Sequence, residues 1–247
     1  MIHYHGGPLN TEASAIRLWQ SRHAFVSFAR KEQTDVAGEV SHSFALDNGA
    51  YIFWKGGKTV DWNKYYQWVD TWRGNPRFDF AVIPDVINGT EEENDALLDD
   101  WPFSRYESCA VWHVNESVGR LVRLAKRFPR IALGSCNEYD VTYPEELLKR
   151  MYDVLPKIVD TRGHPIVKLH GLRMLNPKIF RRLPLKSADS TTIARGCFRD
   201  VRWKGSYQPK SVNGRIDVMV DNIERHVSCS KAELGLAVPD DGQFTLF

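Results

Sequence analysis

Short apolar runs rich in β-branched and aromatic residues recur along the chain, and they alternate with stretches whose apolar positions follow a helical period. Eight of these runs predict β-strands. They span residues 2–5, 24–28, 43–46, 80–84, 110–114, 131–134, 166–170 and 186–189. Strands that alternate with helices form parallel sheets, and eight parallel strands close into a barrel. The pattern therefore predicts the α/β class and a single (β/α)₈ barrel, the TIM-barrel fold.

The stretches between the strands predict helices. They span residues 11–20, 62–72, 91–100, 118–127, 144–159 and 177–182. Two of them have clear starts, because two glutamates follow Pro144 and three glutamates follow Thr90. Acidic residues in a first turn interact favourably with the helix dipole. Between Phe28 and Ser43 the sequence shows no clear helical pattern.

The chain has 247 residues, of which 43% are hydrophobic and 26% are charged, and this is enough apolar material for one large core. A barrel of this kind takes about 250 residues, so we expect one domain. Residues 1–194 would form the barrel core, and residues 195–247 a basic and aromatic C-terminal extension packed on it. The formal net charge of +2 neither requires nor excludes a nucleic-acid partner.

The four cysteines lie far apart, and none belongs to a CxxC or CxC pair, so we expect free thiols and no metal site built on them. The N-terminal MIHYHGGP lacks the basic and apolar regions of a signal peptide. No run of about 18 apolar residues is present to span a bilayer. We expect a cytoplasmic protein without a membrane partner, and nothing in the sequence calls for a cofactor.

The extension begins with a strongly basic segment. Residues 195–215 hold six basic residues against one acid, Asp200, with Phe198, Trp203 and Tyr207 interleaved. Such a segment is either a solvated face or lid, or a groove that contacts a phosphate backbone and stacks on bases. For the second interpretation, the residues expected to bind nucleic acid are Arg195, Arg199, Arg202, Lys204 and Lys210.

Polar residues follow the apolar runs at the ends of most predicted strands. These residues are His5, Asp47, Asp85, His113 with Asn115, His170 and Asp189, and the pair Gly134-Ser135 ends the sixth strand. In this fold the carboxyl ends of the strands form the active-site face. Any one of these residues is explained by a helix cap or a surface turn, but together they predict one site in which acids and imidazoles converge. Gly49 and Gly171 allow tight turns there.

The order of these motifs resembles that of tRNA-guanine transglycosylases. The segment Leu46-Asp47-Asn48-Gly49-Ala50-Tyr51 is similar to their aspartate, serine, glycine, glycine, phenylalanine motif, and Ile83-Pro84-Asp85 to their second base-binding aspartate. The segment 131–135 resembles their glycine-rich strand end, and 187–191 the strand with the nucleophilic aspartate. The histidine-glycine start, the His170-Gly171-Leu172 turn and the Asp189-Ser190-Thr191 ending look closest to the phage-type, DpdA-like DNA transglycosylases.

The resemblance implies an enzyme that replaces guanine in DNA by a free 7-deazaguanine base, in the host cytoplasm if a phage encodes it. Asp189 would be the nucleophile that forms a covalent glycosyl-aspartate, and Asp47 the second catalytic acid. The substrate-binding residues would be Asp85, His113, Asn115, Gly134, Ser135, His170, Gly171, His5 and Tyr51. Trp112 is an alternative to Tyr51 for stacking on the base. The target nucleotide would be flipped or single-stranded.

Two departures from the family pattern matter. The tRNA enzymes carry a CxCxxC and histidine zinc site after the barrel, and this chain has no such cysteines, which favours the DNA branch. Asn48 replaces the usual serine, and His113 with Asn115 stand about where the family places a base-binding glutamine.

Two other functions are compatible with parts of the sequence. His3, His5, His113, His170 and Asp189 resemble the metal ligands of amidohydrolase-type barrels, which would make the protein a metal-dependent hydrolase. The basic segment alone would also serve a non-catalytic nucleic-acid-binding protein, although acids at the barrel mouth would repel phosphates.

Overall fold

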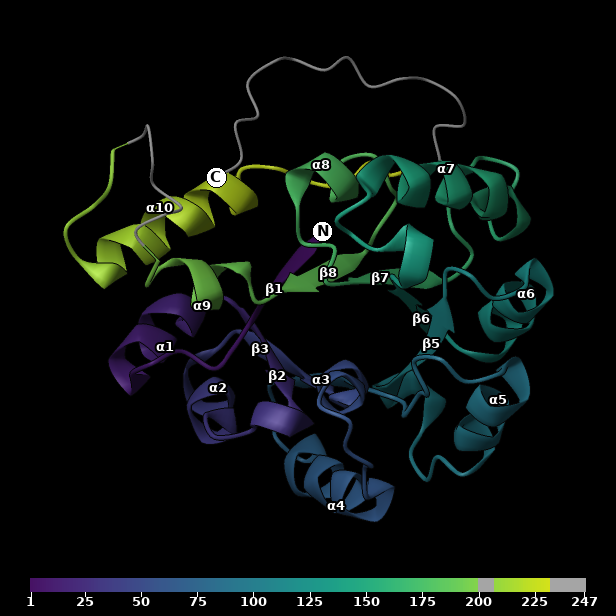
Figure 1. The fold of residues 1–247 in the computed structure, drawn as a ribbon, viewed down its shortest axis with the longest axis horizontal. Coiled ribbons are helices and arrows are strands. Elements are labelled where there is room, and N and C mark those ends of the chain that lie inside the picture. The colour runs from purple at the N-terminus through teal and green to yellow at the C-terminus, as the bar shows by residue number, and fades with distance from the viewer. Residues whose placement is uncertain (200–206, 232–247) are drawn as a thin grey trace.

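The structure is a computed structural model that describes residues 1–199 and 207–231, apart from the side chain of Asn137. In these residues eight parallel strands close into a barrel in sequence order, with β8 paired to β1, as the sequence predicts. The strands are β1 Ile2–Gly6, β2 His23–Ser27, β3 Ser43–Asp47, β4 Phe78–Val82, β5 Ser108–His113, β6 Arg130–Gly134, β7 Lys168–Leu172 and β8 Ser187–Ser190. The chain is therefore a TIM barrel (Figure 1).

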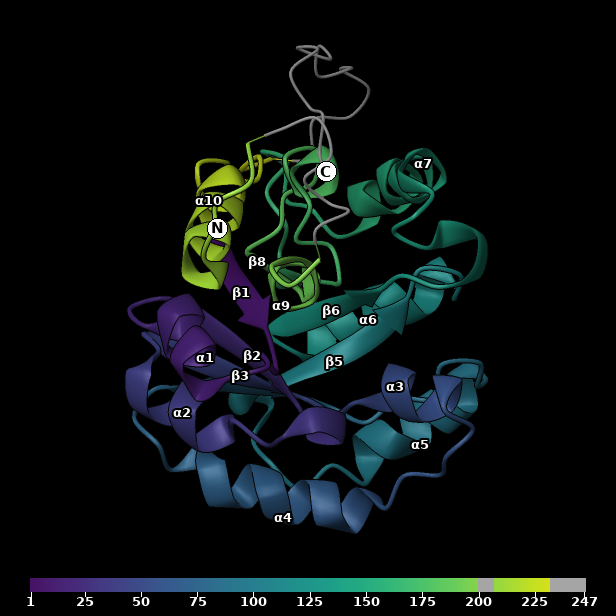
Figure 2. The same ribbon diagram turned by 60° about the vertical axis from the view of Figure 1, so that its left-hand side comes forward.

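Helices follow the strands and surround them. They are α1 Glu12–Trp19, α2 Thr34–Val40, α3 Ala50–Lys55, α4 Trp62–Arg73, α5 Glu91–Asp99, α6 Val118–Arg127, α7 Pro144–Val154, α8 Pro177–Phe180, α9 Thr192–Gly196 and α10 Val212–Glu224. Short 3₁₀ turns occur at η1 Phe28–Arg30, η2 Arg105–Glu107, η3 Asn137–Tyr139 and η4 Leu155–Lys157. Figure 2 shows α4 below the strands and α7 and α10 above them.

The helix starts have the local chemistry expected of them. The Thr90 hydroxyl accepts a hydrogen bond from the Glu93 amide, and the Glu93 carboxylate accepts one from the Thr90 amide, so α5 begins with a complete capping box. Pro144 occupies the first turn of α7, where its missing N–H is not needed.

The strands bury both of their faces. Side chains that point into the barrel form one small core, which includes Tyr4, Phe25, Phe80 and Val111. Side chains on the outer face join the helices in a second, larger core, which includes Leu46 and Trp112. Successive residues of a strand point to opposite faces, so each residue's position in its strand decides whether it reaches the barrel mouth.

Four helices, α2, α3, α9 and α10, are absent from the sequence prediction, and the short α9 directly follows β8. α2 occupies the segment between Phe28 and Ser43, where we expected none. α3 follows β3 directly and precedes α4, so the β3–β4 connection carries an extra helix at the carboxyl end of the strands. α10 lies in the C-terminal extension, where it packs against α1 and α9 and takes a place in the outer ring between α8 and α1 (Figure 1).

No helix in the described part of the chain is long and apolar enough to cross a membrane.

Candidate functional site

Three acids from separate strands meet at the carboxyl end of the barrel. Asp47 ends β3, Asp85 follows β4 and Asp189 lies in β8. Asp47 and Asp189 are in register with inward-facing positions of their strands, and Asp189 is opposite Tyr4 of β1. The carboxylates of Asp189 and Asp85 both act on the ionisation of Asp47, which shows that the three share one electrostatic environment. The structure thus brings these three predicted site residues together.

Asp47 keeps its proton to a higher pH than a free aspartate does. Burial raises its pKa to about 7, and repulsion from Asp189 and Asp85 adds to the effect. The Ser27 hydroxyl on the neighbouring strand and the Gly49 amide, 3.1 Å from Asp47 Oδ2, oppose the rise only in part. Gly49 supplies that amide because its φ of 77° is left-handed and any Cβ there would meet Ala29 at 2.9 Å. A carboxyl group with a pKa near 7 can both give and take a proton at neutral pH.

Asp85 is fixed by partners on both carboxylate oxygens. Oδ1 accepts a 2.7 Å hydrogen bond from Asn48 Nδ2, and Oδ2 lies 2.8 Å from His113 Nε2. On the other side of the imidazole, His113 Nδ1 lies 3.5 Å from Glu116 Oε1. Burial lowers the pKa of His113, but the two carboxylates outweigh it and raise the pKa to about 9. His113 is therefore an imidazolium at neutral pH.

Glu116 continues this network away from the barrel. Its Oε2 lies 2.6 Å from Arg120 Nη1, and Arg120 Nε donates to Asp95 Oδ1 over 2.8 Å. Arg120 is only 1% exposed, and its Nη1 also donates to the Val111 carbonyl, so its charge is compensated. The network thus holds the Nδ1 side of the His113 ring, while Asp85 holds the Nε2 side.

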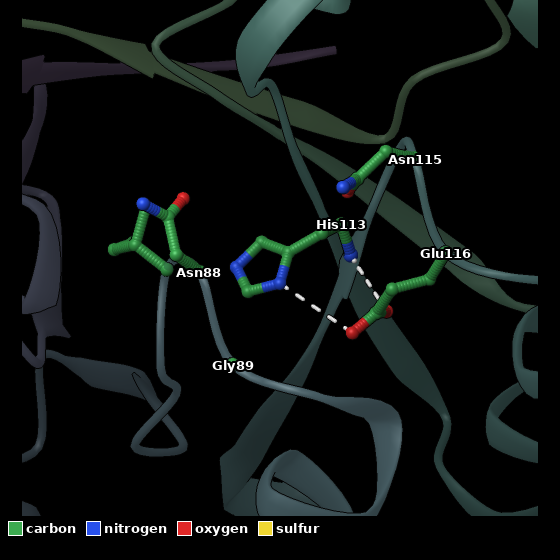
Figure 3. A pocket seen from close by; sticks show the side chains of 6 residues that line it. Asn88, Gly89, His113, Asn115 and Glu116 are labelled. Atoms are coloured by element: carbon green, nitrogen blue, oxygen red, sulfur yellow. Dashed lines mark hydrogen bonds and ion pairs between the residues drawn. The ribbon is translucent and has the colours of Figure 1, made fainter.

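A pocket of about 330 Å³ opens beside this histidine. It is lined by Ile87, Asn88, Gly89, His113, Asn115 and Glu116. Figure 3 shows the His113 ring pointing between Asn88 and Glu116, with Asn115 above it. The cations His113 and Arg120 are paired with Asp85, Glu116 and Asp95, and both ring nitrogens of His113 face carboxylates. The pocket therefore suits an uncharged ligand that hydrogen-bonds to the amides of Asn88 and Asn115.

Asp189 is 5% exposed and is oriented from two sides. Its Oδ1 accepts a 2.9 Å hydrogen bond from the main-chain amide of Arg173 and lies 3.4 Å from His170 Nε2. His170 is fully buried, stacks on Phe25 with the ring centroids 5.2 Å apart, and hydrogen-bonds through Nδ1 to Ser187 Oγ. His170, which the sequence predicts to bind substrate, lies against Asp189.

Tyr51 lies at the mouth under a cation. The Arg173 guanidinium is 4.4 Å from the centre of the Tyr51 ring, and it also pairs with Asp140 over 3.2 Å. Tyr51 is half-buried on α3, the helix that starts directly after Asp47, Asn48 and Gly49. One face of the Tyr51 ring is therefore already covered by Arg173.

Several predicted residues face away from the mouth. His5 points out of the barrel, and its Nε2 lies 2.8 Å from Glu224 of α10. A Cβ on Gly171 would meet Met174 and Leu185, so this glycine permits packing on the outer face. Trp112 is buried in the outer core and donates from Nε1 to the Ser117 carbonyl. His5, Gly171 and Trp112 thus lie on the outer faces of their strands, because neighbouring strand residues occupy the inner face.

The remaining predicted residues of β5 and β6 lie near the pocket. A Cβ on Gly134 would come within 2.8 Å of the His113 ring, so this glycine makes room for the imidazole. Asn115 is exposed, lines the pocket and accepts from Cys136 Sγ over 2.9 Å. Ser135 Oγ is buried without a hydrogen-bond partner among the described residues.

The basic segment is described only in part. Arg195, Arg199 and Lys210 are exposed. Arg202 and Lys204 lie outside the described residues.

The ligand set of the metal-dependent alternative does not come together. His3 Nε2 lies 2.9 Å from the carbonyl of His226 after α10, and His5 faces Glu224, so both imidazoles are outside the barrel. Within residues 1–199 and 207–231, no group of three or more His, Cys, Asp or Glu side chains is arranged to hold a metal ion.

Sequence reasoning missed Glu116, Arg120 and Arg173. Glu116 and Arg120 are four residues apart, a spacing that pairs charges at the start of a helix, and this signal was available. No sequence signal marks Arg173, because its role depends on its backbone conformation.

Comparison of the sequence with known protein families and with curated proteins finds no match. The arrangement of the carboxyl groups at the barrel mouth indicates what chemistry the site can perform. Two carboxylates in different environments can divide nucleophilic attack from proton transfer, as in enzymes that act on glycosidic bonds.

Proposed function

We propose that this protein is a transglycosylase that exchanges guanine in DNA for a free 7-deazaguanine base through a covalent glycosyl-aspartate. The observation that supports the proposal is the meeting of Asp189, Asp47 and Asp85 at one barrel mouth, where Asp47 has a pKa of about 7. The order of the motifs along the chain also fits transglycosylases of this kind.

In the first step, Asp189 attacks C1′ of the nucleotide. The C1′–N9 bond breaks, its electron pair leaves with guanine, and the protonated Asp47 supplies the proton that the departing base takes. An ester bond between C1′ and Asp189 holds the sugar. In the second step, the incoming base attacks C1′, its ring N–H proton returns to Asp47, and Asp189 is released. Protons and electrons therefore balance over the cycle without a redox partner.

The pocket beside His113 supports a neutral heterocycle as the exchanged group. Asn88 and Asn115 offer both donors and acceptors, and Asp85, held by Asn48 and His113, keeps further lone pairs for N–H groups of the base. A base inside a duplex cannot reach a barrel mouth, so the nucleotide has to be flipped out or single-stranded.

The proposal is tested by incubating the protein with plasmid DNA and labelled 7-deazaguanine bases, followed by nucleoside mass spectrometry. Wild-type protein should incorporate the label, and Asp189→Ala should incorporate none. A covalent protein–DNA adduct should be trapped on a denaturing gel with the wild type alone.

The matched control is Asp70→Asn, which changes an aspartate that is 68% exposed on α4. This variant should incorporate label at the wild-type rate. An unchanged rate in Asp189→Ala would overturn the assignment of the nucleophile, and label entering tRNA but not DNA would overturn the choice of nucleic acid.

A further inference from the structure

Arg173, between β7 and α8, has a backbone conformation that side chains rarely adopt. Its φ is 62°, in the left-handed region. A glycine would take this conformation without steric cost, so a long charged side chain at this position requires contacts that compensate for it.

The side chain of Arg173 has such contacts on two other loops. Its guanidinium lies 4.4 Å from the Tyr51 ring centre, which belongs to the β3–α4 connection. It also pairs over 3.2 Å with Asp140, which belongs to the β6–α7 connection. The cation–π contact and the ion pair both hold the guanidinium in place.

The left-handed turn brings the Arg173 amide to the nucleophile. The N–H donates to Asp189 Oδ1 over 2.9 Å, and His170 approaches the same oxygen. Among the described residues, nothing donates a hydrogen bond to Oδ2 of Asp189. Both contacts hold Oδ1, which leaves Oδ2 as the oxygen available to attack a sugar carbon.

We propose that Arg173 is the positioning residue of Asp189: its left-handed backbone presents the main-chain amide that orients the attacking carboxylate, and the contacts of its side chain with Tyr51 and Asp140 compensate for the strain of that conformation. This rests on the proposed function for what Asp189 attacks, but not for the hydrogen bond itself. Small errors in the placement of a reacting group are costly, at roughly 100-fold in rate for an error of about 1 Å.

Variants that differ in their tolerance of positive φ separate the backbone from the side chain. Arg173→Gly and Arg173→Asn accept the left-handed conformation, whereas the β-branched Arg173→Val does not. We expect kcat for base exchange to fall by roughly 10- to 100-fold in Arg173→Val with KM for DNA little changed, and by only a few-fold in Arg173→Gly and Arg173→Asn. Equal losses in all three variants would overturn the proposal, since the side chain alone would then matter.

Ser21 provides the matched control. It is the other non-glycine residue with positive φ in the described chain, at 60°, and it precedes β2, at the opposite end of the barrel from Asp189. Ser21→Val introduces the same backbone conflict far from the site. It should leave kcat unchanged, and a loss equal to that of Arg173→Val would show a general effect of backbone strain.

A second measurement does not depend on catalysis. An amide proton bound to a carboxylate is shifted downfield in ¹⁵N-resolved NMR spectra, so the Arg173 amide should move upfield in Asp189→Ala. The amide of residue 173 should stay downfield in Arg173→Gly and move upfield in Arg173→Val. If the Arg173 amide does not respond to Asp189→Ala, the positioning role is excluded; if it responds but no base exchange is found, the proposed function fails and the positioning role stands.

Discussion

Asp47 lowers the stability of the folded protein at neutral pH, although its raised pKa suits it to proton transfer. Its pKa in the folded protein is about 7, against 3.8 for an ordinary aspartate. The folded state thus binds a proton that the unfolded state releases. The unfolded protein gains from ionisation as the pH rises above about 4, and the folded protein gains equally only above pH 7.

Replacing Asp47 by asparagine should therefore stabilise the protein at high pH. Asparagine keeps an oxygen for the Gly49 amide and removes the buried charge. At about 1.4 kcal/mol per pKa unit, we expect the free energy of unfolding to rise by a few kcal/mol at pH 8 and by much less at pH 4. Urea denaturation of Asp47→Asn and wild type across this range measures the difference. A gain that is the same at both pH values would contradict the raised pKa of Asp47.

The sequence identifies the site acids but not the direction of every side chain. Asp47, Asp85 and Asp189 were recognised because each ends a strand. His5 also ends a strand, yet it points outward. Strands of a parallel barrel are buried on both faces and read as continuous apolar runs, so the pattern of β1 does not distinguish the face of Tyr4 from that of His5.

At the scale of elements, α10 is attached to the barrel by the imidazoles of β1. His5 is 1% exposed, and its Nε2 lies 2.8 Å from Glu224. Burial raises the pKa of Glu224, but the contact with His5 and the nearby Arg22 outweigh it and lower the pKa overall. A carboxylate with a lowered pKa in the folded state stabilises the protein at neutral pH, and this contribution is lost as the pH falls below about 4.5, the ordinary value.

Glu224→Ala should weaken this attachment, because it leaves a buried imidazole nitrogen without its partner. We expect a loss of about 1–3 kcal/mol in the free energy of unfolding at pH 7, with faster hydrogen exchange in α10 than in α5. Asp217→Ala is the control on the same helix. It breaks an exposed pair with Arg17 and should cost much less than Glu224→Ala. Equal losses in the two variants would show that the His5–Glu224 contact contributes no more to the free energy of unfolding than an exposed ion pair does.

The sequence prediction lacks α10, because the charges of residues 195–215 indicate a basic segment rather than a helix. Ile216, Met219, Val220 and Ile223 follow the spacing of one helix face and are buried, and Ser211 caps the start. This periodic signal was in the sequence. α2 and α3 were harder to predict, because with 7 and 6 residues they are too short to show a clear period.

At the scale of the whole molecule, the barrel was predictable because all eight strands are separate apolar runs between turn residues. Parallel strands place their carboxyl ends together, so the location of the mouth follows from the fold. The charge network from Asp85 through His113 and Glu116 to Arg120 did not follow, because it depends on contacts between loops that are distant in sequence.

The same topology places basic residues at the mouth. α9 follows the carboxyl end of β8, so Arg195 lies near the end of the barrel that holds Asp189. Glu224 faces His5 while His226 faces His3, so α10 runs antiparallel to β1. This orientation directs the start of α10, with Lys210, toward the carboxyl end of the strands. A DNA strand at the mouth would thus meet these cations.

If these residues contact phosphates, replacing Arg195, Arg199 and Lys210 together by alanine should weaken DNA binding and its dependence on salt. Each phosphate contact contributes about 0.9 to the steepness of log affinity against log salt for duplex DNA and about 0.7 for single strands. The loss of three contacts should therefore reduce the steepness by as much as about 3 for duplex DNA and about 2 for single strands. The control replaces Lys126, Lys157 and Arg162, exposed cations that precede strands at the opposite end of the barrel. Titrations at several salt concentrations compare the two triple variants. Neither set of replacements includes the three site aspartates, so kcat at saturating DNA should match the wild type in both variants. An unchanged salt slope in the variant that lacks Arg195, Arg199 and Lys210 would assign phosphate binding to another surface.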